Sequence, residues 1–210
     1  MSERLNQFSL WLLTPSYQGK RKKMEAQREE ERRGRAQNIL GRMYQSGEGV
    51  PLNWSKAAAC FREAAELGDM NGQYNLARMY QEGTEVRRDN REAAKWFRMA
   101  AVQGHTQAQY CLGVFYEKGI GIHQDLKEAL KWKLAAAVKG EPRAQNHCGV
   151  RYAGGNGVQK NYRKAYMWLR LAVMQGNRQA RKNISILTDK MTPVQISDAS
   201  QMVREWKPKT

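Results

Sequence analysis

The chain has 210 residues, of which 41% are hydrophobic and 27% are charged, a composition typical of a soluble folded protein and unlike that of a disordered or low-complexity chain. Its longest apolar run, near residues 8–13, is far shorter than the roughly 20 residues that a membrane span requires. The 36 Lys and Arg outnumber the 20 Asp and Glu and give a net charge of +16, which favours acidic partners: nucleic acid, an anionic membrane or an acidic protein.

Residues 1–35 are interpreted as a basic N-terminal segment. Its second half has a helix-forming and almost wholly charged composition, which fits either a lead-in helix or a mobile basic arm. Four consecutive cations begin this half: Lys20, Arg21, Lys22 and Lys23. No clear signal-peptide cleavage site precedes them, and the chain's three cysteines are widely spaced. We therefore expect a cytoplasmic protein with reduced thiols.

From residue 36 onward the sequence repeats with a period of 36 residues. Four blocks, at 36–71, 72–107, 108–143 and 144–179, align without a gap, and a partial fifth block covers 180–190. One position that coincides in all four blocks holds Tyr44, Tyr80, Tyr116 and Tyr152. Another holds Trp96, Trp132 and Trp168, with Cys60 in the first block. Self-similarity at such a period is typical of a solenoid, in which the repeated Tyr, Trp and Ala form the core.

Each block predicts two helices joined by a turn. In the first block the first helix covers about 36–45, where apolar residues recur at helical spacing, and Gly47 ends it. The turn reads Gly-x-Gly-Val or Gly-x-Gly-Ile, except that the second block has Glu85 at the second Gly, so we expect an altered turn there. The second helix of each block begins after an N-capping residue, namely Asn53, Asp89, Asp125 or Asn161.

The predicted fold class is all-α, an α/α superhelical solenoid, because one hairpin cannot bury its own apolar face whereas stacked hairpins can. The array covers 36–190. Residues 191–210 are expected to form a capping helix, at 193–206, and a tail. Thr192 and Pro193 supply the start of this helix, and Ile196, Ala199 and Trp206 lie on its apolar stripe.

The consensus pattern of the blocks is Ala-Gln-x-x-Leu-Gly-x-x-Tyr, then Gly-x-Gly-Val, then Asp, then Ala-x-x-Trp-x-x-x-Ala-Ala-x-x-Gly. This pattern resembles the Sel1-like repeat, a relative of the tetratricopeptide repeat. The resemblance covers 36–179 and extends weakly to about 190, and residues 191–206 are similar to a tail that often follows such arrays in bacterial members. It implies an α/α superhelix that serves as a scaffold or adaptor for other proteins. Some cysteine-rich members were proposed to bind or hydrolyse β-lactams, but this chain lacks both their cysteine pairs and a Ser-x-x-Lys motif.

The predicted binding surface is the concave one, which the first helix of each hairpin lines. Its side chains vary between blocks while the core positions stay fixed: Asn38, Arg42, Tyr74, Arg78, Tyr110 and Asn146. Asn can pair with a peptide backbone, Tyr and Arg anchor partners, and Arg pairs with carboxylates through two hydrogen bonds. We predict a scaffold that binds an acidic or extended segment of another protein; the alternative is that these side chains are only solvated.

A second hypothesis is binding of nucleic acid or an anionic surface through the N-terminal segment and the last full block. That block has six Lys and Arg and no Asp or Glu, and it includes Arg163, Lys164 and Arg170. The competing interpretation is a solvated charged face, and the chain has no recognised nucleic-acid-binding motif.

Catalytic and metal-binding patterns are weak. Cys111 and His147 share one repeat position, but no third ligand lies at a suitable spacing, and Cys148 replaces a core Leu of the other blocks. There is no phosphate-binding loop, nucleophile elbow or paired His motif. We expect no enzymatic activity, no metal, no cofactor and no small-molecule substrate.

Overall fold

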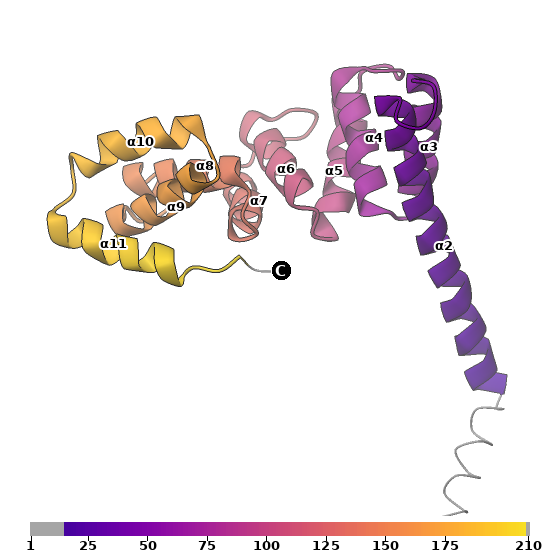
Figure 1. Ribbon diagram of the computed structural model, residues 1–210, viewed down its shortest axis with the longest axis horizontal. Helices are drawn as coiled ribbons and strands as arrows, with labels where there is room; N and C mark the ends of the chain where they lie inside the picture. Colours follow the sequence, from indigo (N-terminus) through magenta and orange to yellow (C-terminus); the bar gives the residue numbers. More distant parts are fainter. Residues whose placement is uncertain (1–14, 209–210) are drawn as a thin grey trace, which may run out of the picture. The chain divides into compact units, whose positions relative to one another are not determined.

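The computed structural model describes residues 15–208, so the apolar run near 8–13 lies outside the described residues (Figure 1). The regular structure of the described residues is entirely α-helical. The helices are α2 (Pro15–Ser46), α3 (Trp54–Glu66), α4 (Met70–Glu82), α5 (Asn90–Val102), α6 (Thr106–Lys118), α7 (Leu126–Val138), α8 (Pro142–Gly154), α9 (Tyr162–Met174), α10 (Arg178–Thr188) and α11 (Pro193–Glu205). The chain forms two compact units, residues 1–73 and 74–210, and each is described by itself.

The first unit is dominated by α2, a single continuous helix that extends well beyond α3 (Figure 1). Residues 20–33 of α2 are all exposed to solvent. Its later part packs on α3 because two glycines let the helices approach closely. A Cβ at Gly41 would lie 2.7 Å from the Phe61 ring, and a Cβ at Gly34 would lie 3.2 Å from that of Leu67. Arg33 also forms an ion pair with Glu63.

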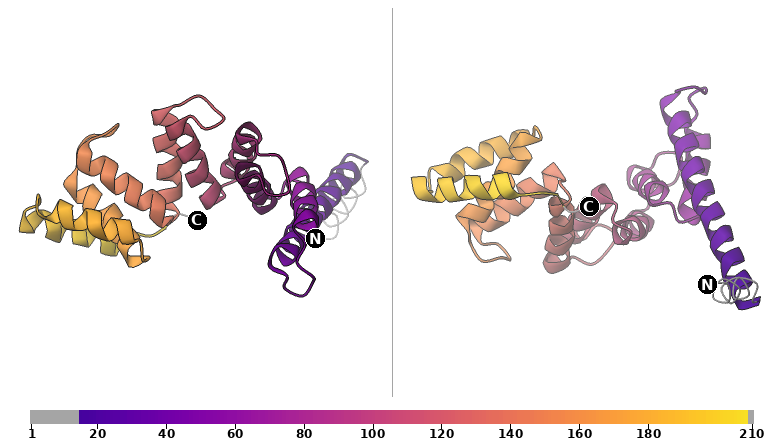
Figure 2. Two further views of the ribbon diagram at one scale, coloured as in Figure 1. Left: turned by 90° about the horizontal axis from the view of Figure 1, so that it is seen from above. Right: turned by 60° about the horizontal axis from the view of Figure 1, so that its bottom comes forward.

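In the second unit each helix packs on the next, from α5 to α9, and α10 and α11 both pack on α9 (Figure 2). The repeated alanines are fully buried, as predicted, and the glycines and alanines allow close helix contact. The repeated Tyr and Trp are core residues only in part. Tyr116 and Trp168 are buried, whereas Trp96 and Trp132 are half-buried.

The half-buried rings lie at the edge of the core, each beside the ammonium group of a lysine. The ammonium group of Lys95 lies 5.8 Å from the Trp96 ring centroid, and that of Lys131 lies 5.7 Å from the Trp132 centroid. This position therefore combines apolar packing with cation–π contact. The prediction that Trp96 and Trp132 belong to the core is confirmed only in part, because each ring packs against the core cluster but keeps some surface accessible beside a lysine.

The predicted N-caps are confirmed. Asp125, for example, accepts hydrogen bonds from the backbone N–H groups of Lys127 and Glu128, at 2.8 and 3.0 Å. The equivalent side-chain acceptors are Asn53, Asp89 and Asn161. At α11 the Thr192 hydroxyl accepts from the Gln195 N–H and the Gln195 side chain accepts from the Thr192 N–H, a complete capping box.

The turn of the second block is not altered, contrary to expectation. Glu85 adopts φ of 57°, in the left-handed region that Gly49, Gly121 and Gly157 adopt in the other blocks. The backbone of the turn is retained because its flanking hydrogen bonds are the same in the second and third blocks. Asp89 N–H donates to the Tyr80 carbonyl and Asp125 N–H donates to the Tyr116 carbonyl, both at 3.0 Å.

Candidate protein-binding surfaces

The first-helix surface of the second unit presents two aromatic rings, each held by a neighbouring side chain. Tyr74 stacks on His105 with ring centroids 4.4 Å apart. The guanidinium of Arg143 lies 4.5 Å from the Tyr110 centroid, and Glu141 fixes it through a 2.7 Å ion pair. Burial raises the pKa of both tyrosine hydroxyls, so they remain neutral donors.

Each side chain predicted for the concave surface has a definite environment. Tyr74, Tyr110 and Asn146 are half-buried, and Asn146 accepts a 2.8 Å hydrogen bond from Asn183. Arg78 is exposed and pairs with Glu82, at 3.1 Å from Nε to Oε1.

In the first unit, Arg42 is exposed, whereas Asn38 is only 6% exposed. Asn38 therefore offers a partner little surface, and Arg42 is the accessible member of this pair.

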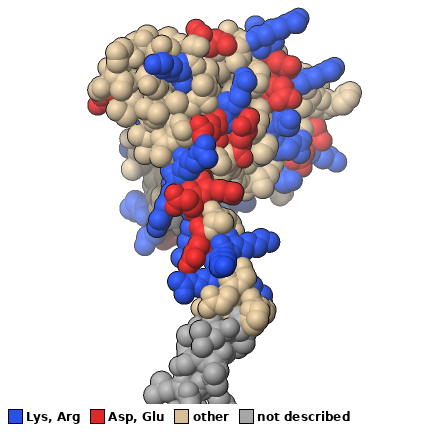
Figure 3. All heavy atoms as spheres, turned by 90° about the vertical axis from the view of Figure 1, so that its right-hand side faces the viewer, with Lys and Arg blue, Asp and Glu red and all other residues tan. Residues whose placement is uncertain are grey.

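The seven cations of the second hypothesis are all exposed, but acids pair with two of them. Along α2, Figure 3 shows basic and acidic side chains interleaved, and Arg21 pairs with Glu25 at 2.8 Å. The other three of the four consecutive cations, Lys20, Lys22 and Lys23, are exposed. In α9, Arg163 pairs with Asp198 at 3.1 Å, the Lys164 ammonium lies 5.6 Å from the Tyr152 centroid, and Arg170 is exposed.

A buried ionic cluster, which the sequence analysis missed, links α6, α7 and α8. The carboxylate of Glu117 accepts from Lys133 Nζ at 2.6 Å, from His147 Nε2 at 2.9 Å and from Arg151 Nη2 at 2.8 Å. Lys133 is 1% exposed, and the other three side chains are between 20% and 26% exposed. One carboxylate thus bridges two fixed cations that are largely withdrawn from water, so the cluster keeps an excess of positive charge.

Burial and hydrogen bonding act in opposite directions in this cluster. Burial raises the pKa of Glu117, but hydrogen bonds from Lys133, His147 and Arg151 outweigh it and lower that pKa to about 2. Burial lowers the pKa of His147 more than Glu117 raises it, so the neutral imidazole is favoured. Burial likewise lowers the pKa of Lys133, while Glu117 opposes that change.

A break in the repeat pattern would have revealed the cluster. Lys133 occupies the position of Phe61, Phe97 and Leu169, and Arg151 occupies that of Met43, Met79 and Phe115. The Lys133 stem fills the space of the missing ring. A Cβ at Gly113 would lie 2.6 Å from Lys133 Cγ, just as one at Gly41 would meet the Phe61 ring. Charged residues at two core positions were the signal in the sequence.

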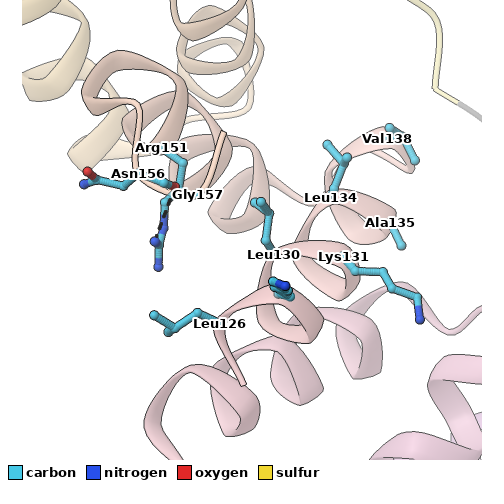
Figure 4. A pocket seen from close by; sticks show the side chains of 10 residues that line it. Leu126, Leu130, Lys131, Leu134, Ala135, Val138, Arg151, Asn156 and Gly157 are labelled. Atoms are coloured by element: carbon cyan, nitrogen blue, oxygen red, sulfur yellow. Dashed lines mark hydrogen bonds between the residues drawn. The ribbon is translucent and has the colours of Figure 1, made fainter. Parts of the chain in front are cut away.

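Beside this cluster, α7 carries an apolar groove of about 770 Å³. Figure 4 shows Leu126, Leu130, Leu134 and Val138 following one another along α7, with Arg151 and Asn156 across from them. Lys127, Lys131, Ala135 and Gly157 complete the lining. The sequence analysis missed this groove too, although Leu134 stands where the other blocks have Arg62, Arg98 and Arg170.

Nothing in the described part of the chain groups three or more His, Cys, Asp or Glu side chains for a metal. Burial raises the pKa of Cys111 to about 11 and that of Cys148 to about 12, so both are thiols at neutral pH. Cys148 is fully buried, as its core position predicted. Among residues 15–208, no helix is both long and apolar enough to cross a membrane.

The fold defines a class: an all-α solenoid of stacked helical hairpins. The Sel1 repeat family model matches residues 34–69, 71–105, 106–139 and 142–177, and the chain belongs to the Sel1 repeat family. The resemblance and the fold class predicted from the sequence are thereby confirmed. Proteins of this family generally mediate protein–protein interactions and are typically non-catalytic scaffolds.

Solved structures support the same assignment. A Sel1 repeat protein from Oxalobacter formigenes is 33% identical with a TM-score of 0.69, and the match covers 83% of this chain and 74% of that one. The protein c5321, a protective antigen of uropathogenic Escherichia coli strains with an SLR fold, is 27% identical with a TM-score of 0.59. That match covers 82% of this chain but only 45% of c5321. The comparison with curated proteins gave no match.

Proposed function

We propose that the protein is a non-enzymatic adaptor that binds a segment of another protein on its first-helix surface. One observation supports this most strongly. The alanines that recur in every block are buried, whereas the varying row keeps accessible surface at Tyr74, Arg78, Tyr110 and Asn146. In a repeat array, accessible variation on a constant core is how different partners are recognised.

The chemistry of this surface suits an extended segment with acidic residues. The rings of Tyr74 and Tyr110 are held in place by His105 and Arg143, so little side-chain entropy is lost on binding. Arg78 has donors beyond those used by Glu82, since a guanidinium carries five N–H groups. The first unit carries an exposed cation of its own, Arg42, at the repeat position equivalent to that of Arg78. The free thiols fit a cytoplasmic protein, which we propose as its location.

The test is capture from the lysate of the protein's own cells, on immobilised full-length chain with and without nuclease, read by mass spectrometry. We expect one discrete protein that survives nuclease and is lost with the double variant Arg42→Glu and Arg78→Glu. The matched control is Arg62→Glu with Arg91→Glu, which reverses two exposed charges on second helices. Circular dichroism checks that both variants remain helical.

Two outcomes would contradict the proposal. Equal capture by wild type and by the Arg42 and Arg78 variant would remove the first-helix surface as the binding site. Capture of a broad set of proteins that nuclease releases would show that the net charge governs binding, as the second hypothesis requires.

A further inference from the structure

The groove along α7 is an exception within the array. Its apolar stripe has the residues Leu126, Leu130, Leu134 and Val138 at intervals of four. The equivalent stripe of the second block is Asn90, Ala94, Arg98 and Val102, and that of the fourth is Tyr162, Tyr166, Arg170 and Met174. Packing between repeats therefore does not require four aliphatic side chains here, since the same hairpin stacks without them elsewhere.

The stripe remains open to solvent. Leu126 is 52% exposed, and Leu130, Leu134 and Val138 are half-buried. From Leu126 to Val138 the helix rises about 18 Å, or roughly three turns. A recess of about 770 Å³ with this length accepts a row of side chains from a partner helix. A flat lipid surface would leave such a recess unfilled.

The charge around the groove selects the partner. Its lining includes the cations Lys127, Lys131 and Arg151 and no carboxylate. Glu128 holds Lys131 at 2.9 Å and Glu117 holds Arg151 at 2.8 Å, which orients both cations and leaves them further N–H donors. Lys127 has no ion-pair partner within residues 15–208. The rim is therefore complementary to an acidic partner.

We propose that the α7 groove binds an amphipathic helix of another protein, with apolar residues every three or four positions and acidic residues beside them. This inference goes beyond the proposed function, because it uses a second helix and none of the first-helix row. The helix would lay its apolar face on Leu130 and Leu134 and place its carboxylates near Lys127, Lys131 and Arg151.

The probe is a fluorescein-labelled helical peptide long enough to span α7, about 14 residues, with Leu at every third or fourth position and Glu beside them. A comparator peptide has Lys in place of each Glu. Fluorescence anisotropy with the full-length chain measures both affinities. We expect the acidic peptide to bind at least about tenfold more tightly than the basic one.

The decisive variant is Leu130→Ala with Leu134→Arg, which restores the residues that the second block has at these positions, Ala94 and Arg98. It should fold, because the new guanidinium can contact Tyr152 as Arg98 contacts Tyr116. We expect the acidic peptide to bind at least about tenfold more weakly, although the variant has one more positive charge. Attraction by charge alone predicts the opposite sign.

The matched control is Val102→Arg, which adds the same charge to α5 at a position that is 71% exposed. It should leave the affinity of the acidic peptide within about twofold. No binding of either peptide, equal binding of both, or unchanged binding to the Leu130 and Leu134 variant would each overturn the proposal. The proposal would also be overturned if the groove bound another copy of the chain. Sedimentation would then show self-association of wild type that the Leu130 and Leu134 variant abolishes.

A membrane is tested with vesicles of phosphatidylserine and phosphatidylcholine. Vesicle binding that the Leu130 and Leu134 variant loses, without peptide binding, would overturn the proposal in favour of a lipid surface. The peptides do not probe Arg42 or Arg78, and the lysate capture uses variants outside the groove. Failure of this proposal and failure of the proposed function are therefore distinguishable.

Discussion

Two successive junctions of the second unit place charge in opposite ways on the same backbone. Where α5 meets α6, the core contact is between Phe97 and Phe115, whose rings meet edge to face with centroids 5.3 Å apart. The polar contact lies at the edge, where Arg98 donates to the Tyr116 hydroxyl. This is the ordinary arrangement, with apolar groups inside and a snorkelling cation outside.

Where α7 meets α8, the arrangement is inverted. Lys133 and Arg151 occupy the two positions of that aromatic pair, and Glu117 bridges them. At the edge, Leu134 replaces the arginine and joins an apolar cluster with Tyr152. The repeat therefore fixes where side chains lie but not their polarity. Moving charge into the core of this junction leaves an apolar groove on its outer side.

The largest loss of stability is expected from a substitution that breaks the inverted junction. Glu117→Gln, which installs the residue that the second block has at this position, leaves Lys133 and Arg151 without their shared anion. We expect the free energy of unfolding to fall by about 3 kcal/mol, the lower part of the range for breaking buried pairs, because the cluster is partly exposed. Urea unfolding followed by circular dichroism measures it.

The control for that experiment is Glu92→Gln, which removes the acid of an exposed pair with Lys95 at 3.6 Å. Its expected cost is below about 1 kcal/mol. Equal losses for the two variants would show that the cluster contributes no more than a surface ion pair.

Acid should weaken the same junction in a defined range of pH. The Glu117 pKa is lowered from 4.5 to about 2, so its ionised form contributes stability that is complete above about 4.5. That contribution is lost as the pH falls from about 4.5 to about 2. Wild type and Glu117→Gln should therefore differ most at neutral pH and converge toward pH 2. A constant difference in their urea midpoints would contradict the assigned pKa.

A smaller effect of opposite sign is expected when the whole cluster is replaced. The triple variant Glu117→Gln, Lys133→Phe and Arg151→Met installs the residue types of the second block, Gln81, Phe97 and Met79. We expect it to be as stable as wild type or more stable by up to about 2 kcal/mol, since apolar residues often replace buried ion pairs without loss. A variant less stable than Glu117→Gln alone would refute this view of the junction.

Sequence periodicity was sufficient for the fold because the hairpin depends on local signals. The N-caps such as Asp125 and the buried alanines such as Ala129 recur in register, and both lie where their pattern predicted. The ionic cluster depends on contacts between residues 16 to 34 positions apart, such as Glu117 with Lys133 and with Arg151. Periodicity alone does not place such residues in contact; they are marked by the charged Lys133 and Arg151 at positions that are apolar in the other blocks.

The smallest effect is expected at the turn position that Glu85 and Gly121 share. Substitutions there distinguish a requirement for positive φ from a requirement for close packing. Glu85→Gly in the second block relieves a non-glycine residue at φ of 57°, while the freer unfolded chain offsets part of the gain, so stability should rise by only about 0.5 kcal/mol. Gly121→Ala in the third block should cost far more, because its Cβ would lie 2.3 Å from the Asn90 carbonyl oxygen. Thermal unfolding of both variants measures the pair. A gain at Glu85 with a loss at Gly121 would show that the third block needs glycine for the close approach of α5, whereas the second block needs only a residue that can adopt positive φ.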